Sequence, residues 1–545
     1  MRHPLILSIS CALLLGMLAS ATVHASFTGE VASAPGTQAA AGHVLDPGFN
    51  GGGFILDRFA GPNTANYRGR KVARSQNGDI IAVGLVPPYN QPDQPNGYFN
   101  IGLVRYDATG RRVAWAWNSA YGHYNNEYLI YPGGETSGQL PPRFTAVKDL
   151  KVFGKRIYVL VDNEPTAGDS NTHLLVFTDN GADSGRFLGH YNMSTAPTIR
   201  EYGAGLAVMP GLLTIAPDRL VVAMTQFDAS GPYVTVRRYI IGGANPVEPD
   251  TAFGDNGSRH ISLTRAAGGC APSAAVNGFC PLQAYSIDIG HRGLGSGASP
   301  IYIGAERQYS SPTASSNDWD VAVIKLDSNG TLQTSFGTGT GNGGGNGFAF
   351  VQFERGRMED RIRGIHVRTT GLGLPNLPYR DELYVVASIS QECAAGVGIG
   401  KLDASGQFVS SFGAYGKVRF GGWDDPGDAQ ACAVYNATRP FAVARAGDTL
   451  AIAGQSDAYV WGDFLPSAAV GFVDIDDGSV LPGFTHAVTP PWASFPSTST
   501  LYGIIANDDG SFTVTGDAGD TSTGNTLLFA TARITSDSIF ADGFQ

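Results

Sequence analysis

The chain has 545 residues, 73 of them glycine, with 15% charged residues and a formal net charge of −11 at pH 7. Surfaces that bind nucleic acid or anionic membranes need clustered lysine and arginine, so this composition argues against both as partners. The sequence lacks the long Ala/Leu/Glu/Lys pattern of a helical protein, and a single compact core would be unusual at this length. An array of repeats avoids that limit, because each unit packs only against its neighbours.

The first 25 residues have the pattern of a secretory signal peptide. Arg2 precedes an apolar run over residues 5–18, and Val23 and Ala25 stand at the small-residue positions of a cleavage site after Ala25. A retained membrane anchor is the alternative. Residues 26–42 form a linker, and no later segment reaches the roughly 18 apolar residues of a spanning helix. We therefore expect a mature protein without an integral membrane segment, either secreted, periplasmic or at the cell surface.

Seven candidate units follow, each marked by one regular apolar strand. These strands cover residues 81–86, 157–162, 220–225, 301–306, 383–388, 450–455 and 512–517. A weaker apolar strand precedes each of them, and a partner strand follows. Four strands per unit at this spacing are typical of a propeller blade. The sequence predicts an all-β, seven-bladed β-propeller with four antiparallel strands per blade, as a single domain over residues 43–535; six or eight blades are the alternatives.

The unit at residues 320–354 illustrates the local physics. Its first strand, VAVIKLD, is apolar at nearly every position, so both faces of the strand must be covered. In the DSNG turn that follows, Asp327 supplies a side-chain acceptor and Gly330 can take a positive φ. Phe336 and Gly337 then place a large apolar anchor beside a residue without a side chain. Such a pair suits a strand end that bends over its neighbour.

The two ends of the repeat region complement one another. The last unit has no Phe-Gly strand after residues 531–534, and that piece stands instead at residues 45–59, LDPGFNGGGFILDRF. An N-terminal strand is therefore expected to complete the last blade and close the ring, which leaves no open sheet edge. Residues 536–545 form an acidic and aromatic tail similar to those of exported proteobacterial proteins. This tail is either a sorting or attachment signal or a frayed terminus.

Four fragments share one pattern: LDPGFNGGGF, DTAFGDNG, KLDSNGTLQTSFGTG and KLDASGQFVSSFGAYGKV. They resemble the delta-60 repeat, a β-propeller repeat of secreted and surface bacterial proteins. The resemblance is good in the N-terminal strand and in units three to five, fair in unit one, and poor in units two, six and seven. It implies a propeller fold but no particular reaction or ligand.

Cysteine usage fits an oxidising compartment. Cys11 leaves with the signal peptide, and four cysteines remain: Cys270, Cys280, Cys393 and Cys432. An even number predicts two disulfides, with Cys270–Cys280 in one loop and Cys393–Cys432 between two loops on the same face of the ring. A zinc site is the alternative, but the sequence has neither CxxC nor neighbouring His pairs, so no metal is expected.

Long loops are predicted on one face of the ring, at residues 87–100, 120–142, 308–319 and 421–440. Aromatic and acidic groups gather on this rim, among them Trp319, Trp423, Asp424, Asp425 and Trp461. Loops on a rigid scaffold often carry recognition, and such groups can stack on sugar rings or hold a polypeptide. An unknown carbohydrate or protein ligand is therefore the expected partner. Packing beneath long loops is the alternative role of these residues.

Catalytic signatures are mostly missing. The sequence has no GxSxG elbow, HExxH or P-loop, and a GxGxxG match at residues 339–344 has no helix after it, so no cofactor is expected. Alignment of the weak first strands places one column in the channel: Ala73, Lys148, Ala207, Asp288, His366, Ala444 and Ile505. Asp288 could orient the imidazole of His366 for general-base chemistry. Solvation by channel water is the alternative.

We therefore expect a secreted, disulfide-bearing propeller that acts as a binding or surface-interaction module and not as an enzyme. One alternative is a propeller-borne hydrolase or lyase that works in the central channel, and another is a structural component of the envelope. An enzyme requires ionisable groups that converge in a pocket, whereas a binding module requires an exposed aromatic rim.

Overall fold

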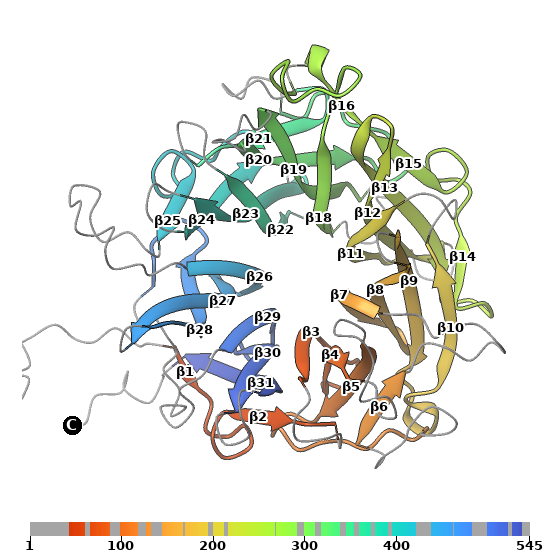
Figure 1. Ribbon diagram of the computed structural model, residues 1–545, viewed down its shortest axis with the longest axis vertical. Coiled ribbons are helices and arrows are strands. Elements are labelled where there is room, and N and C mark those ends of the chain that lie inside the picture. Colours follow the sequence, from red (N-terminus) through yellow and green to blue (C-terminus); the bar gives the residue numbers. More distant parts are fainter. Residues whose placement is uncertain are drawn as a thin grey trace, which may run out of the picture. The chain divides into compact units, whose positions relative to one another are not determined.

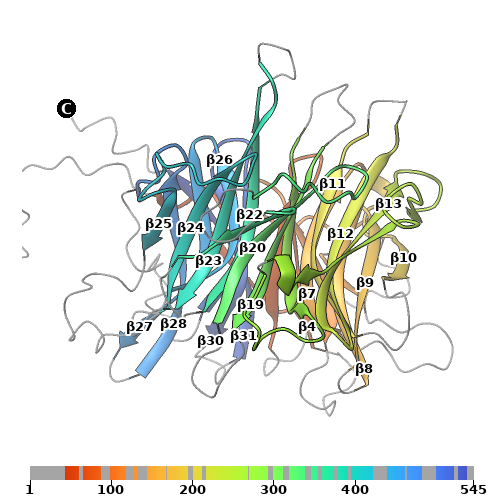
Figure 2. The same ribbon diagram turned by 90° about the horizontal axis from the view of Figure 1, so that it is seen from above.

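Seven antiparallel sheets stand around a central channel, and their strands run between the two faces of the ring (Figures 1 and 2). The computed structural model describes residues 43–59, 66–87, 99–117, 127–131, 144–166, 169–193, 200–211, 216–267, 269–291, 299–310, 318–337, 345–353, 359–371, 377–390, 395–420, 438–460, 463–481, 499–520 and 526–536. The predicted signal peptide, the linker and residues 537–545 of the tail lie outside these ranges. The arrangement confirms the predicted seven-bladed propeller.

The first four blades follow the chain. Blade 1 consists of β3 (Arg68–Arg74), β4 (Ile80–Val86), β5 (Asn100–Tyr106) and β6 (Tyr128–Tyr131). Blade 2 consists of β7 (Phe144–Phe153), β8 (Arg156–Thr166), β9 (Asp169–Thr178) and β10 (Phe187–Asn192). Blade 3 consists of β11 (Glu201–Met209), β12 (Asp218–Asp228), β13 (Gly231–Ile241), β14 (Val247–Pro249) and β15 (Ser258–Ile261). Blade 4 consists of β18 (Leu282–Ile289), β19 (Ile301–Ser310), β20 (Asp318–Leu326) and β21 (Phe348–Val351).

The remaining three blades complete the ring. Blade 5 consists of β22 (Asp360–Thr370), β23 (Arg380–Ser390), β24 (Ala395–Asp403) and β25 (Lys417–Phe420). Blade 6 consists of β26 (Thr438–Ala446), β27 (Thr449–Val460) and β28 (Asp463–Asp474). Blade 7 consists of β29 (Ser499–Ala506), β30 (Phe512–Asp520), β31 (Thr526–Ser536), β1 (His43–Leu45) and β2 (Phe54–Asp57).

Three blades depart from the expected count of four strands, and blade 7 does so because both β1 and β2 pair with β31. Both β14 and β15 pair with β13, so the outer edge of blade 3 is divided, and blade 6 has three strands within the described residues. A separate hairpin of β16 (Leu263–Thr264) and β17 (Phe279–Cys280) follows blade 3. Two short 3-10 helices, η1 (Gly181–Asp183) and η2 (Arg265–Ala267), lie between strands. Within the described ranges, no helix has the length and apolar character needed to cross a bilayer.

The N-terminal segment closes the ring, as predicted. Its two short strands lie along β31 of the last blade, with His43 opposite Ser536 and Asp57 opposite Phe529. The outer edge of blade 7 is therefore covered by residues from the other end of the chain. Such a closure leaves the blade no free edge on that side.

The hydrophobic core is divided among the contacts between neighbouring blades. Each of seven main clusters of buried side chains joins one pair of neighbouring blades, and one of these clusters joins blade 7 to blade 1. Every residue of β4 is buried, which agrees with the uninterrupted apolar pattern of the second strands. Because the core is divided among seven junctions, the propeller is not subject to the size limit of a single compact core.

The predicted turns have the expected structure. In the turn of blade 4, Asp327 Oδ1 accepts the N–H groups of Asn329 and Thr331, and Gly330 has a φ of +85°. In blade 5, Asp403 Oδ1 accepts the N–H group of Ser405 in the same way. The aspartate therefore stabilises the turn, and the glycine supplies a conformation that side chains disfavour.

Phe-Gly pairs, and the Phe49-Asn50 pair of the N-terminal segment, join neighbouring blades at four junctions. Phe336 of blade 4 packs on Gly406 in the turn of blade 5, where a Cβ atom would lie 3.0 Å from the ring. The N–H group of Gly337 also donates to the carbonyl of Ser405 at 2.8 Å. The same double contact recurs at three other junctions, between Phe49 and Gly110, Phe253 and Gly330, and Phe412 and Gly478. The repeated pattern thus encodes contacts between blades.

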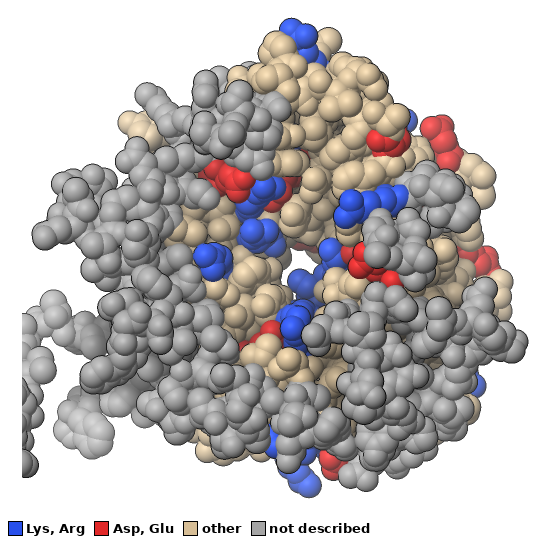
Figure 3. Space-filling view, viewed as in Figure 1, with Lys and Arg blue, Asp and Glu red and all other residues tan. Residues whose placement is uncertain are grey.

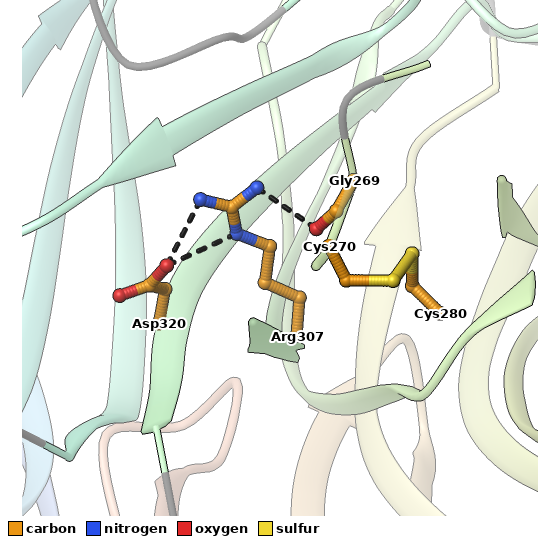
Figure 4. The surroundings of a disulfide bond; sticks show 5 residues. All are labelled: Gly269, Cys270, Cys280, Arg307 and Asp320. Carbon is orange, nitrogen blue, oxygen red and sulfur yellow. Dashed lines mark hydrogen bonds and ion pairs between the residues drawn. A yellow bond between two sulfur atoms is a disulfide. The ribbon is translucent and has the colours of Figure 1, made fainter. Parts of the chain in front are cut away.

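The predicted Cys270–Cys280 disulfide is present, and it ties the hairpin between blades 3 and 4 (Figure 4). Arg307 of β19 anchors this hairpin, because its Nη1 donates to the carbonyl of Gly269 at 2.9 Å. The same guanidinium pairs with Asp320 at 2.9 Å, and both side chains are almost fully buried. Cys393 and Cys432 lie outside the described residues, so their pairing stays a prediction.

Candidate functional site

The first strand of every blade carries a β-bulge at the same level of the channel. In each first strand one residue at this level stands between two consecutive pairs of the ladder and is left over by the register, and β7 has a second such residue at Thr145. These bulged residues are Arg70, Lys148, Ala204, Tyr285, Arg363, Phe441 and Tyr502. A bulge re-aims the side chain it carries, and bulges are common beside functional sites. We call these seven residues the bulge ring.

Small residues beside the bulges let the first strands approach closely. A Cβ atom on Gly69 would lie 2.5 Å from the carbonyl oxygen of Gly516 in blade 7. A Cβ atom on Gly364 would lie 2.7 Å from the side chain of Val443 in blade 6. A side chain at Gly69 would clash with the backbone of blade 7, and one at Gly364 would displace Val443, so both glycines allow neighbouring blades to approach around the channel.

A cavity of about 320 Å³ opens among the first strands, and residues from all seven blades line it. Among the described residues, its charged lining consists of five cations and one carboxylate: Lys71, Arg74, Lys148, Lys151, Arg363 and Asp149. The chain as a whole is acidic, so this excess of positive charge is local. Figure 3 shows lysine and arginine side chains around the central opening. Such a lining favours an anion.

Aromatic rings of the bulge ring lie next to two of its cations. The guanidinium of Arg70 lies 4.0 Å from the centre of the Tyr502 ring, and the Tyr502 and Phe441 rings are 5.0 Å apart. Arg363 lies between Phe441 and Tyr285, 6.0 Å and 5.9 Å from their ring centres. One side of the channel mouth is thus a continuous row of flat aromatic and guanidinium groups, which suits stacking as well as charge recognition.

Two of the channel lysines have carboxylate partners. Lys148 Nζ lies 3.1 Å from Asp162 Oδ2, and Lys151 Nζ lies 3.7 Å from Asp149 Oδ2. Asp162 is almost fully buried, which holds Lys148 at a defined position on the channel wall. Arg74 Nη1 also lies 2.6 Å from Asp508 Oδ2. Among the described residues, Lys71 and Arg363 are therefore the lining cations without an ion pair.

Lys71 of blade 1 reaches across the lining to blade 7. Its Nζ donates to the carbonyl of Tyr502 at 3.4 Å. Burial lowers the pKa of Lys71, and the charges of Lys151, Lys148 and Arg70 lower it further, although Asp149 opposes them. A ligand with negative charge at this position would favour the protonated lysine.

A column of buried polar residues lies on the second strands, next to the first strands that carry the channel cations. It consists of the last residue of each predicted second strand in blades 2 to 7: Asp162, Thr225, Glu306, Ser388, Gln455 and Asp517. Five of them bond to the first strand of the next blade, through Gly203, Ala284, Arg361, Thr500 and Arg70. The column therefore fixes the first strands relative to one another, and with them the bulge ring.

Glu306 makes this column sensitive to pH. Burial raises the pKa of Glu306 to about 7, more than Arg361 and Arg363 lower it. Because the folded pKa lies above the ordinary value, this group favours the folded state at acidic pH and loses that contribution as pH rises towards 7. We expect Glu306→Gln to be stabilised relative to the natural chain at pH 8, by on the order of 2–3 kcal/mol, and to be similar to it at pH 5.

Thermal unfolding of both proteins between pH 5 and pH 8 measures this difference. Arg361 keeps Glu359 as a second partner at 3.2 Å in the variant, so its guanidinium is not left unpaired. A difference in melting temperature that stays constant or shrinks with rising pH would contradict the assigned role of Glu306.

The structure brings the predicted channel pair together. Asp288 Oδ2 lies 3.7 Å from His366 Nδ1, on the first strands of blades 4 and 5. Arg445 Nε donates to the other ring nitrogen of His366 at 3.3 Å. Burial lowers the pKa of His366, and Asp288 opposes that shift. The imidazole is therefore held between an acid and a guanidinium, outside the lining of the 320 Å³ cavity.

Asp288 also has a structural role. Its Oδ1 accepts the N–H group of Ile289, and its Oδ2 accepts that of Val367 in the next blade at 2.8 Å. Asp149 makes the equivalent pair of bonds, to Leu150 and to Leu206 of blade 3. A carboxylate that joins the first strands of two neighbouring blades thus occurs twice in the ring.

The predicted rim residues are only partly described. Trp319 is 7% exposed, and the guanidinium of Arg361 lies 4.6 Å from the centre of its ring. A ligand therefore has little access to the ring face of Trp319 in this conformation. Trp423, Asp424, Asp425 and Trp461 lie outside the described residues, and their role in ligand binding stays a prediction.

Most of the bulge ring was missed by alignment of the first strands, which singled out Lys148 alone among its members. An alignment without gaps does not detect an extra residue in a strand. A signal was nevertheless present, because in blades 3 to 7 a small residue follows the bulged one. These small residues are Gly205, Ser286, Gly364, Ala442 and Gly503.

No family model and no curated protein sequence matches this chain. Several solved structures are similar to it. An endo-arabinase from Bacteroides thetaiotaomicron is 12% identical, with 62% of this chain and 94% of that chain covered and a TM-score of 0.29. The β-propeller domain of the trilobed protease from Pyrococcus furiosus is 11% identical, with 88% and 98% covered and a TM-score of 0.36. Drosophila plexin A in complex with semaphorin 1b is 8% identical, with 90% and 88% covered and a TM-score of 0.31.

Proposed function

We propose that this chain is a non-enzymatic binding module that holds an anionic ligand in the mouth of its central channel. The observation that carries the proposal is the lining of the cavity, in which five cations accompany one carboxylate although the chain is acidic. Burial and the neighbouring cations together lower the pKa of Lys71. A bound anion would raise the pKa of Lys71 again and stabilise its protonated form. The site should therefore favour negatively charged ligands.

The proposed setting is outside the cytoplasm. The signal-peptide pattern of residues 1–25 supports export, and the Cys270–Cys280 disulfide fits an oxidising compartment. We also propose membership in the delta-60 repeat family. Support comes from the fragments that carry the resemblance, because their Phe-Gly pairs and aspartate turns are the groups that join consecutive blades.

The geometry gives less support to a hydrolase or lyase. A general base needs a ring nitrogen that can take a proton from the substrate. In His366 one nitrogen accepts from Arg445 and the other faces Asp288, whose oxygens also accept two backbone N–H groups. These contacts account for the pair as a link between blades, so we assign it no catalytic role.

Binding to a combined array of glycans and peptides tests the proposal. We expect the natural chain to bind anionic members, and Arg363→Ala to weaken that binding by about tenfold or more, because a charge-assisted hydrogen bond contributes about 1.5–3 kcal/mol. Arg186→Ala is the matched control, since Arg186 is 43% exposed in blade 2 and pairs only loosely with Asp183 at 4.0 Å. Equal binding by both variants, or preference for neutral array members, would refute an anion site in the channel.

A further inference from the structure

We infer that the ligand is an acidic saccharide, with a sugar ring stacked on Tyr285 and its carboxylate or sulfate group held by Arg363 and Lys148. The inference rests on the proposed function and narrows its ligand to one chemical class. Four observations carry it: the exposure of Tyr285, the position of the two cations, the state of Arg363 and the size of the cavity.

Tyr285 is the aromatic group most accessible to a ligand in the bulge ring. Its bulge on β18 places it in the cavity lining, and the side chain is 38% exposed. A ring held at a bulge offers one flat face at a fixed position, which a stacked sugar requires.

Cations flank Tyr285 from the neighbouring parts of the ring. Burial and the charge of Glu306 raise the pKa of Tyr285, whereas the charges of Arg363, Arg361 and Lys148 lower it. Tyr285 lies in blade 4, Arg363 in the neighbouring blade 5, and Lys148 in blade 2. Both cations line the same cavity as Tyr285. An acid group on a sugar stacked there would therefore meet positive charge on either side.

Arg363 is available for a ligand. Among the described residues its guanidinium makes no hydrogen bond or ion pair, and its Nε is buried without a partner. Its distances to Tyr285 and Phe441 lie near the 6 Å limit of a cation–π contact, so neither ring holds it closely. A planar guanidinium matches a carboxylate or sulfate through two parallel hydrogen bonds.

Space for the sugar lies beside Tyr285. The bulged residue of the blade between Lys148 and Tyr285 is Ala204, the smallest side chain of the bulge ring, and it also lines the cavity. The cavity volume of about 320 Å³ is at the lower end of the range for small-molecule sites, which is about 300–1,000 Å³. A short saccharide end fits such a space, whereas a folded protein domain does not.

An acidic saccharide uses all of these features together. The C–H face of a pyranose can stack on an aromatic ring while an acid group on the same ring reaches a cation. An inorganic anion would use the cations and leave the face of Tyr285 unused. An acidic peptide would likewise use the charges without needing a flat platform, so both are suitable comparison ligands.

Calorimetric titration with matched probes tests the inference. The probes are uronate-containing and sulfated oligosaccharides, their uncharged counterparts, sodium sulfate and an oligoglutamate peptide. The proteins are the natural chain, Tyr285→Ala, Tyr285→Phe and Arg363→Ala. Tyr415→Ala is the control for loss of an aromatic side chain, because Tyr415 is 87% exposed on an outer turn of blade 5.

We expect acidic oligosaccharides to bind, and Tyr285→Ala to weaken their binding by roughly two- to tenfold, as expected for the loss of one aromatic contact. Tyr285→Phe and Tyr415→Ala should bind like the natural chain. Arg363→Ala should lose the preference for acidic over uncharged oligosaccharides. Sulfate should bind more weakly than the saccharides and should be unaffected by Tyr285→Ala.

Two results would overturn the inference in distinguishable ways. Binding of oligoglutamate or sulfate as tightly as any acidic oligosaccharide, with no effect of Tyr285→Ala, would reject the saccharide and leave the anion site intact. Failure of every anionic probe to bind would reject both the inference and the proposed function.

Discussion

Asp57→Ala is expected to lower the free energy of unfolding by about 3–5 kcal/mol, because it removes one partner of a buried ionic cluster. Asp57 is fully buried on β2, the strand that completes blade 7. Its carboxylate accepts from the hydroxyl of Tyr128 at 2.9 Å, from Arg112 Nε at 2.6 Å and from the hydroxyl of Tyr106. These three donors belong to blade 1, so one carboxylate joins the two ends of the ring.

The substitution leaves these donors without an acceptor. Burial, followed by the charge of Asp57, raises the pKa of both Tyr106 and Tyr128, so the two phenols stay protonated. Without the carboxylate, Arg112 retains Glu127 at 3.7 Å, a longer contact with a partly exposed group. The substitution should therefore weaken the contact between blades 7 and 1 that closes the ring, as well as the position of β2.

Urea denaturation measures this effect, with Asp183→Ala as the control. Asp183 is 46% exposed and makes a single 4.0 Å contact with Arg186, so its loss should change stability by no more than about 0.5 kcal/mol. If Asp57→Ala does not fold, Asp57→Asn keeps an acceptor oxygen and should show a smaller loss in the same direction. Stability equal to that of the control would contradict the role assigned to Asp57.

Phe336→Ala should destabilise the protein by about 3–5 kcal/mol, as expected when a buried phenylalanine is truncated. Phe336 is 1% exposed, packs on Gly406 of the next blade and contacts Tyr302 edge to face at 6.0 Å. The cavity left by the ring would lie at the junction of two blades. The backbone bond from Gly337 to Ser405 depends on the same junction.

Phe336→Leu should cost less than half as much, since it keeps an apolar side chain on Gly406. Leu377→Ala is the control, because Leu377 is 53% exposed. Both variants can be compared with the natural chain by thermal or urea unfolding. A small effect of Phe336→Ala, similar to that of the control, would mean that the Phe-Gly pair does not hold the blades together.

Much of the fold could be predicted because its signals are local. The second strands are apolar at almost every position, and Asp327 and Gly330 specify a turn through neighbouring atoms alone. Ring closure could also be predicted, since residues 45–59 supply the piece that the last unit lacks. The strand and turn signals each lie within one repeat. The signal for closure is a fragment of the same repeat that stands at the other end of the chain.

The candidate site was less predictable because it depends on register. Asp288 and His366 were aligned correctly as neighbours, yet the side chains that line the cavity are Tyr285 and Arg363, three residues earlier in the same strands. A bulge adds one residue to a strand and changes the direction of its side chain. The first strands are also only weakly apolar, so their pattern does not mark which residues face the channel.

Repeat spacing, apolar runs and turn residues were sufficient to predict the propeller and its closure, because each acts over a short stretch or through a repeated pattern. The Cys270–Cys280 disulfide was predicted from the even number of cysteines and from the position of both residues in one loop. The cationic cavity could not be inferred in this way from an acidic chain. Its charges come from β3, β7 and β22, which are spread over residues 68–370, and they meet only after the blades have packed into a ring. Which of them face one another is decided by the bulges and by the contacts between blades, and neither can be read from a single strand.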